Sequence, residues 1–182
     1  MFRAIIAHPF KSESSMSSIA SIFPIRLSNF IIAAGCAVLI GIALYMQHSM
    51  GLEPCPLCMT QRVAIIAVGV VAAIAFLHHP AGAMRRVYAG LGALFAVLGG
   101  AVSSRQLWLQ SLPEDQVPAC GPSLEYMLET FPLADTLRVM LQGDGNCAEV
   151  VWTFMGLSIP GWTLIAFIGL CGVNLWQMLR RQ

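Results

Sequence analysis

Four long stretches of the chain contain no Asp, Glu, Lys or Arg. They cover residues 27–52, 63–84, 87–104 and 150–179. Each is near or above the roughly 18 to 20 residues with which an α-helix, rising about 1.5 Å per residue, crosses about 30 Å of hydrocarbon. The pattern therefore predicts an all-α bundle of four transmembrane helices, with spans at about 29–48, 60–78, 87–107 and 161–179.

The ends of two spans follow from particular residues. The third stretch is the shortest, but Gln106, Leu107 and Trp108 continue it past Arg105 to an interfacial anchor. The fourth helix is expected to begin near Pro160, because proline suits the first turn of a helix.

Composition supports this assignment and sets the domain organisation. Hydrophobic residues make up 57% of the chain and charged residues 10%, against about 45 to 50% and about 25% in soluble domains. We expect one membrane domain over 27–182, surrounded by lipid, after a cytoplasmic segment over 1–26 that begins at Met1 or Met16. A net charge of +1 gives no reason to expect nucleic-acid binding.

The charged residues divide between the two sides of the predicted membrane. Seven basic residues lie on one side: Arg3, Lys11, Arg26, Arg85, Arg86, Arg180 and Arg181. The opposite loops are acidic and hold Glu53 in the first, and Glu114, Asp115, Glu125, Glu129, Asp135, Asp144 and Glu149 with Arg138 in the second. The positive-inside rule then predicts that both termini are cytoplasmic. A cleaved signal peptide is the alternative, but the first apolar run is too long for one and lacks a small-residue cleavage site.

The longer acidic loop contains an amphipathic pattern. Apolar residues recur at helical spacing at Leu124, Met127, Leu128 and Phe131, and Leu133, Leu137 and Leu141 follow after Pro132. We predict a short helix that lies on the outer membrane surface, since the segment is too short and too charged to cross.

The six cysteines fall into two groups. Cys36 and Cys171 lie within spans, where a free thiol behaves as a small hydrophobic residue. The other four lie in the two loops of the extracytoplasmic side, where disulfides persist: Cys55, Cys58, Cys120 and Cys147.

Cys55 and Cys58 have the CxxC spacing of dithiol oxidoreductases and stand where the second span begins. Backbone N–H groups and the helix dipole stabilise a thiolate there, so one of the two thiols should have a lowered pKa. A zinc knuckle and a passive disulfide have the same spacing. A four-cysteine zinc site is disfavoured on an oxidising side, and no metal is predicted.

The loop pair and one arginine each allow two interpretations. Cys120 and Cys147 could form a structural clip or exchange disulfides, and the turn-rich surroundings of Cys120 favour exchange. Arg62 shares a helical face with Cys58, so it either stabilises negative charge there or extends to the lipid headgroups.

Several segments together resemble the DsbB family of disulfide bond formation proteins. They are Gln47-His48, Glu53 to Arg62, Val117 to Pro122, Asn146 to Glu149 and Trp152 to Trp162, in the order and at separations that suit the family. The resemblance extends from about Asn29 to Trp176. Gln61 stands where some relatives have Glu, and Gln106 where His is often found, so no quinone contact is assigned to either.

The resemblance implies a thiol oxidase of the bacterial inner membrane that uses ubiquinone or menaquinone from the membrane quinone pool. Its partner would be a periplasmic DsbA-like thiol oxidase, which in its reduced form attacks Cys120 and frees Cys147. Electrons would then pass to Cys55 and Cys58, and Arg62 would stabilise charge on the quinone.

Two other functions remain open. Vitamin K epoxide reductase-like enzymes also combine a membrane CxxC with loop cysteines and a quinone, but their loop pair precedes the CxxC. A membrane scaffold with two structural disulfides is the non-enzymatic alternative, and it predicts cysteines that resist mild reduction.

Overall fold

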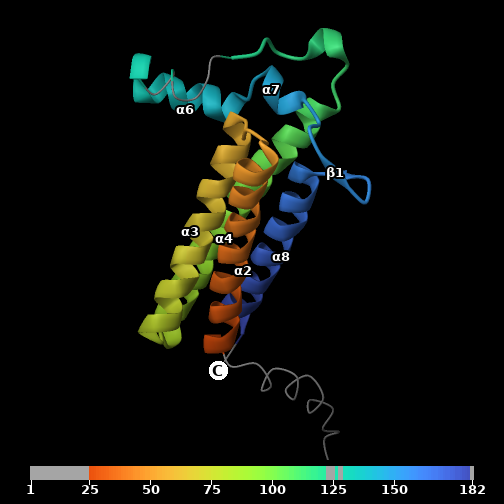
Figure 1. Ribbon diagram of the computed structural model, residues 1–182. Helices are drawn as coiled ribbons and strands as arrows, with labels where there is room; N and C mark the ends of the chain where they lie inside the picture. The colour runs from red at the N-terminus through yellow and green to blue at the C-terminus, as the bar shows by residue number, and fades with distance from the viewer. Residues whose placement is uncertain (1–24, 122–125, 127–128, 181–182) are drawn as a thin grey trace, which may run out of the picture.

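The computed structural model describes residues 25–121, 126 and 129–180. Four long helices lie side by side as a bundle: α2 (Ile25–Met50), α3 (Pro56–His78), α4 (Gly82–Gln110) and α8 (Ile159–Leu179) (Figure 1). All four are long and apolar enough to cross a membrane. The predicted four-helix transmembrane bundle is therefore confirmed.

Two helices begin earlier in the chain than the predicted spans, because the span limits were placed with the help of charged residues, which can lie within a helix. Helix α3 begins at Pro56 rather than near 60, because Pro56 stands in the first turn and Cys55 is the N-cap. Helix α4 begins at Gly82 rather than near 87 and carries Arg85 and Arg86 in its first turns. A charged residue marks the edge of the hydrocarbon, but it does not end a helix. At its other end α4 continues past Arg105 to Gln110, as expected.

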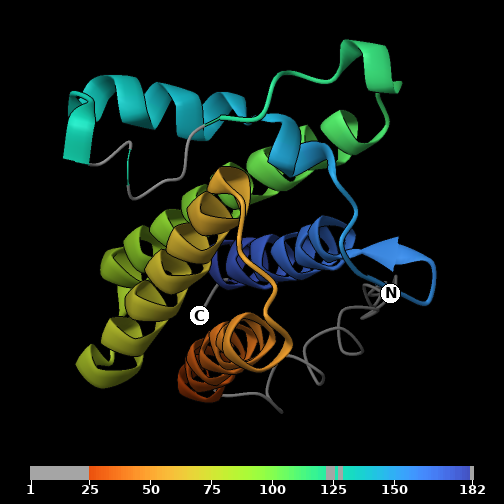
Figure 2. The same cartoon turned by 45° about the horizontal axis from the view of Figure 1, so that its top comes forward.

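The remaining elements all lie at one end of the bundle (Figures 1 and 2). They are the 3-10 helix η1 (Glu114–Gln116), α6 (Leu133–Gln142), the short α7 (Gly145–Ala148) and the strands β1 (Thr153–Phe154) and β2 (Leu157–Ser158). The two strands form a hairpin in which Thr153 is opposite Ser158. Its turn, Met155-Gly156, has positive φ at both residues, as a two-residue type I′ turn requires.

Helix α6 lies across the end of the bundle (Figure 1). Its Leu137 and Leu141 are exposed, which fits an apolar face without a protein partner. The upstream part of the predicted amphipathic segment, with Leu124, Met127 and Leu128, falls outside the described residues. Contact between this segment and a membrane surface stays a prediction.

The bundle is apolar on its outside and packed with small residues inside. Large aliphatic side chains such as Val38, Val63 and Ile168 are more than half exposed, as expected of helices surrounded by lipid. Small residues let the helix axes come close. A Cβ atom on Gly99 of α4 would overlap the ring of the fully buried Phe167 of α8, so glycine at this position makes room for that ring between the two helices.

Candidate functional site

The first pair of cysteines caps helix α3. The Cys55 sulfur accepts the backbone N–H of Cys58 at 3.4 Å, and the two sulfurs lie 3.1 Å apart. This is contact between two thiols, because a disulfide bond measures about 2.05 Å. Both sulfurs therefore stand at the positive end of the helix dipole, as the sequence predicted, where negative charge on sulfur is favoured.

The loop cysteine Cys147 lies beside this pair. It sits on α7, is completely buried and packs against Leu57 and Leu109. Cys55 packs against the cluster that contains Cys147, and the interaction between the two thiols raises the pKa of Cys55 and lowers the pKa of Cys147. The backbone N–H groups of Leu57 and Asp144 lower the pKa of Cys147 further, and burial opposes them. Cys147 is thus buried in contact with the first pair, in surroundings that favour its thiolate form.

Cys120 lies on the outer side of α7 and is exposed. The segment before it is held to α7 by a hydrogen bond of 3.3 Å from the Gly145 N–H to the carbonyl oxygen of Ala119. A Cβ atom on Gly145 would stand 3.1 Å from the Cys120 sulfur and 2.6 Å from the Pro118 carbonyl oxygen. Glycine at this position therefore lets the Cys120 segment lie directly against the helix that carries Cys147.

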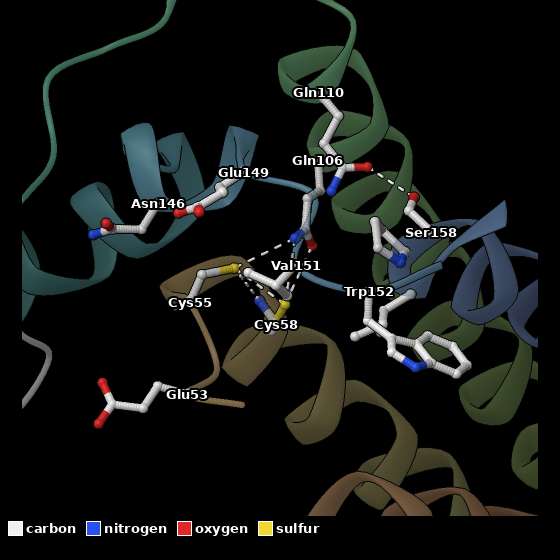
Figure 3. A pocket seen from close by; sticks show the side chains of 12 residues that line it. Glu53, Cys55, Cys58, Gln106, Gln110, Asn146, Glu149, Val151, Trp152 and Ser158 are labelled. Carbon is white, nitrogen blue, oxygen red and sulfur yellow. Dashed lines mark hydrogen bonds between the residues drawn. The ribbon is translucent and has the colours of Figure 1, made fainter. Parts of the chain in front are cut away.

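Two buried glutamines stand next to the cysteine pair, and sequence reasoning had assigned them no role. The Gln106 amide nitrogen on α4 lies 3.4 Å from the Cys55 sulfur and 3.3 Å from the Cys58 sulfur (Figure 3). Gln61 donates to the Gln106 amide oxygen at 2.7 Å and accepts from the Thr163 hydroxyl at 2.6 Å. Polar residues within predicted spans were the one signal that could have identified them, because such residues are rare in lipid unless they have a function.

Arg62 is held by α2. Its guanidinium donates to the Gln47 side-chain oxygen at 2.5 Å and to the Ala43 carbonyl oxygen at 3.1 Å. These bonds tie the half-buried guanidinium to α2. Arg62 and Cys58 line the same cavity, as their spacing on one helical face predicts.

That cavity has a volume of about 470 Å³ and lies between α2, α3, α8 and the hairpin. We call it the membrane cavity, because its walls are mostly apolar side chains of three spanning helices. Trp152, Phe154 and Trp162 form an aromatic wall, with neighbouring ring centroids 6.0 Å apart. Glu53, Cys58, Gln61, Arg62 and Thr163 supply the few polar groups of its lining. Its size and chemistry suit a flat apolar molecule that carries hydrogen-bond acceptors.

A second pocket, of about 40 Å³, is lined by Cys55 and Cys58 and has a larger share of polar residues than the membrane cavity (Figure 3). We call it the polar pocket. Glu53 and Glu149 line it together with Gln110, which accepts a hydrogen bond from Ser158 at 2.8 Å. Cys58 lines both pockets, so it stands at the boundary between them.

The remaining cysteines and histidines lie apart from this arrangement. Cys36 is buried in the apolar core, and Cys171 packs against it. Within the part of the chain that the structure describes, no group of three or more His, Cys, Asp or Glu side chains is arranged to hold a metal ion.

Comparison with known proteins identifies the family of the chain. The family model for disulfide bond formation protein DsbB matches residues 25–177. Proteins named disulfide bond formation protein B are similar over most of their length. The one from Saccharophagus degradans is 57% identical over 156 residues, or 86% of this chain and 94% of the relative. The one from Stutzerimonas stutzeri is 55% identical over 85% of this chain and 96% of the relative, and the one from Chromobacterium violaceum is 47% identical over 86% and 95%. The chain is therefore a multi-pass membrane protein that belongs to the DsbB family of disulfide bond formation proteins.

Proposed function

We propose that this protein oxidises a reduced, DsbA-like dithiol protein in the bacterial periplasm and passes the two electrons to a quinone in the inner membrane. The observation that carries the proposal is the position of Cys147, which is buried against Cys55 while Cys58 lines the membrane cavity. The sulfurs thus lead from an exposed loop cysteine to a cavity among spanning helices. A water-soluble dithiol and a lipid-soluble acceptor need such a connection.

The proposed orientation rests on charge. The cysteines and the acidic loops lie at one end of the bundle, and the basic Arg26, Arg85 and Arg180 lie near the other (Figure 1). Under the positive-inside rule the basic end is cytoplasmic and the cysteine end faces the periplasm. Both termini are then cytoplasmic, and the four cysteines work in an oxidising compartment.

The first half of the proposed reaction takes place on the loops, starting from a Cys120–Cys147 disulfide. A thiolate of the reduced partner attacks the exposed Cys120 sulfur, forms a mixed disulfide and displaces Cys147 as a thiolate. The second thiol of the partner then attacks its own mixed disulfide and releases Cys120. The partner leaves with a disulfide, and both electrons remain on the loop pair.

The second half transfers these electrons to α3, starting from a Cys55–Cys58 disulfide. The Cys147 thiolate attacks Cys55, with which it is in contact, and Cys58 leaves as a thiolate at the helix N-terminus. Cys120 then attacks Cys147, which restores the loop disulfide and frees Cys55. Cys55 has no proton to donate while it is in the disulfide, but the backbone N–H groups of Leu57 and Asp144 still lower the pKa of Cys147, which favours the thiolate that attacks.

The membrane cavity fits a quinone, and Cys58 and Arg62 are the residues that would meet it. When bound, a quinone supplies the two-electron acceptor, and with two protons it leaves as quinol. The aromatic wall of Trp152, Phe154 and Trp162 matches a flat ring. The Arg62 guanidinium, fixed by Gln47 and Ala43, offers planar donors to a carbonyl oxygen.

The test is quinone reduction by the purified protein supplied with a reduced thioredoxin-like dithiol oxidase. We expect ubiquinone or menaquinone to be reduced in proportion to the partner disulfide formed, and Cys58→Ser to stop the reaction. If the wild-type protein reduces neither quinone while its four loop cysteines resist mild reductant, the scaffold alternative is correct instead.

A further inference from the structure

We propose that Gln106 is a positioning residue of the cysteine pair: its amide N–H groups, oriented by Gln61, stabilise the thiolate that forms on Cys58 when the Cys55–Cys58 disulfide is reduced. The inference rests on the proposed function, because it concerns the reduced state through which electrons pass. It goes further by assigning a task to a side chain of α4 that carries no redox chemistry of its own.

The geometry of Gln106 supports this assignment. Its amide nitrogen is within 3.4 Å of both sulfurs. The same side chain can therefore donate a hydrogen bond to Cys55 or to Cys58, whichever sulfur carries the negative charge. Its amide oxygen lies 3.6 Å from the Cys58 sulfur, where it accepts from a protonated thiol. Hydrogen bonds to a charged sulfur are stronger than those to a neutral one. The contact therefore favours the charged, reduced state over the disulfide.

The orientation of the amide is set by other buried residues. Gln61 donates to the Gln106 oxygen, which directs the Gln106 nitrogen toward the sulfurs. Thr163 of α8 donates in turn to the Gln61 oxygen, and Ser103 lies 3.2 Å from the Thr163 hydroxyl. Gln61 and Gln106 are 2% and 3% exposed, so a reversed amide would leave buried polar atoms without partners.

The same pair of side chains stands between the two pockets. Gln106 lines the polar pocket, Gln61 lines the membrane cavity, and their hydrogen bond joins the two linings. The charged groups nearby are Glu149 in the polar pocket, Arg62 in the membrane cavity and Glu53, which lines both. A glutamine supplies a donor next to the sulfurs without adding a charge or a titrating group to this site.

The experiment measures the equilibrium between the Cys55–Cys58 dithiol and its disulfide in glutathione buffers at one pH. The protein is full length, with Cys120 and Cys147 replaced by Ser so that only this pair exchanges. We expect Gln106→Met to lower the equilibrium constant for reduction about tenfold, since one hydrogen bond to a charged group is lost. Tenfold corresponds to a shift of about 30 mV to more negative potential. Gln106→Glu keeps the shape but loses the donor, and should shift the equilibrium at least as far.

Gln110→Met is the matched control. Gln110 lies one turn further along α4 and lines the same pocket, but its hydrogen bond is to Ser158 and not to sulfur. In Gln110→Met the equilibrium constant for reduction of the Cys55–Cys58 disulfide should stay within twofold of that of the parent protein. Gln61→Met leaves Gln106 in place without its orienting donor and should give a smaller shift in the same direction. It also provides the test if Gln106→Met does not fold.

Two results would overturn the inference: an equilibrium constant for the Gln106 variants equal to that of the parent protein, or an equal shift in Gln110→Met. Neither measurement uses a quinone or a partner protein. If the wild-type protein fails to reduce quinone, the proposed function is wrong whatever the glutathione equilibrium shows. If it reduces quinone and the Gln106 variants leave the equilibrium unchanged, only the role of Gln106 is wrong.

Discussion

Cys147 and Cys55 belong to different loops, yet Cys55 packs against the cluster of buried side chains that contains Cys147. The contact joins the loop cysteines to the cysteines of helix α3. The proposed relay requires such a contact, because thiol exchange requires that one sulfur reach another.

The contact predicts a specific cross-link. In a Cys58→Ser/Cys120→Ser variant, the two remaining loop cysteines are Cys55 and Cys147, and mild oxidation should join them quantitatively. Peptide mass spectrometry after alkylation checks this. A Cys58→Ser/Cys147→Ser variant is the control. Its Cys120 is exposed, with its sulfur beside Gly145 of α7, and should link to Cys55 slowly. Equal yields in the two variants would contradict the arrangement of α7.

Variants of the two cysteine pairs should stop the reaction at different steps. Cys147→Ser should trap a mixed disulfide between Cys120 and the oxidised partner, because the Cys120 thiolate attacks the partner's disulfide and no Cys147 thiol remains to displace the partner from Cys120. A non-reducing gel detects the complex. Cys36→Ala and Cys171→Ala are controls in the apolar core and should leave turnover intact. If Cys147→Ser traps no partner and turnover persists, the loop pair is structural.

The pKa of Cys147 should depend on the donor at position 55. With the Cys55 thiol present, Cys147 stays a thiolate below the ordinary cysteine pKa of about 8.5 and loses its charge only as pH falls through the lowered value. Cys55→Ala removes the donor, so the pH midpoint for alkylation of Cys147 should rise toward that of a free thiol. Cys55→Ser retains a hydroxyl donor and should keep the midpoint lower than Cys55→Ala does. Identical profiles would mean that Cys55 does not act on Cys147.

Arg62 should affect quinone binding more than thiol exchange. Arg62→Lys keeps the charge but loses the planar pair of donors, so the apparent KM for quinone should rise about tenfold while Cys55 and Cys58 still oxidise. Steady-state kinetics with varied quinone checks this. Arg105→Lys is the matched control, because Arg105 is exposed and lies over the Trp108 ring at 4.5 Å. An unchanged KM in Arg62→Lys would leave Arg62 as a link between α2 and α3 only.

Helix packing offers a test of the bundle itself. Gly99→Ala should destabilise the protein by about 1 to 3 kcal/mol, since the new methyl group overlaps the Phe167 ring. Gly100→Ala is the neighbouring control, where the nearest atom to the added Cβ is 3.6 Å away. Unfolding in mixed detergent micelles measures both. Equal stability of the two variants would show that α4 and α8 do not pack as described.

Topology can be tested with fused reporters. A reporter after Arg86 should have cytoplasmic activity, and one near Gly143 should have periplasmic activity. A cytoplasmic signal at Gly143 would place all four loop cysteines in a reducing compartment, where a disulfide relay does not persist.

The sequence by itself determined the number of spanning helices and the position of the CxxC pair at a helix start. Both are local properties. An uncharged run such as 27–52 must cross lipid as a helix, because only a helix satisfies its own backbone hydrogen bonds there. Pro56 after Cys55 similarly marks the first turn of α3.

Only the tertiary structure decided which residues meet the sulfurs. Gln106 stands on α4 and reaches the pair because α3 and α4 pack together, which no local pattern specifies. Gln61 was known to neighbour Arg62 along the chain, but its bond to Gln106 and to Thr163 of α8 depends on the axial register of three helices. Lipid-facing and core residues are both apolar in such a bundle, so hydropathy carries no information on register. The contact of Cys147 with Cys55 likewise depends on how the long loop folds back over α3.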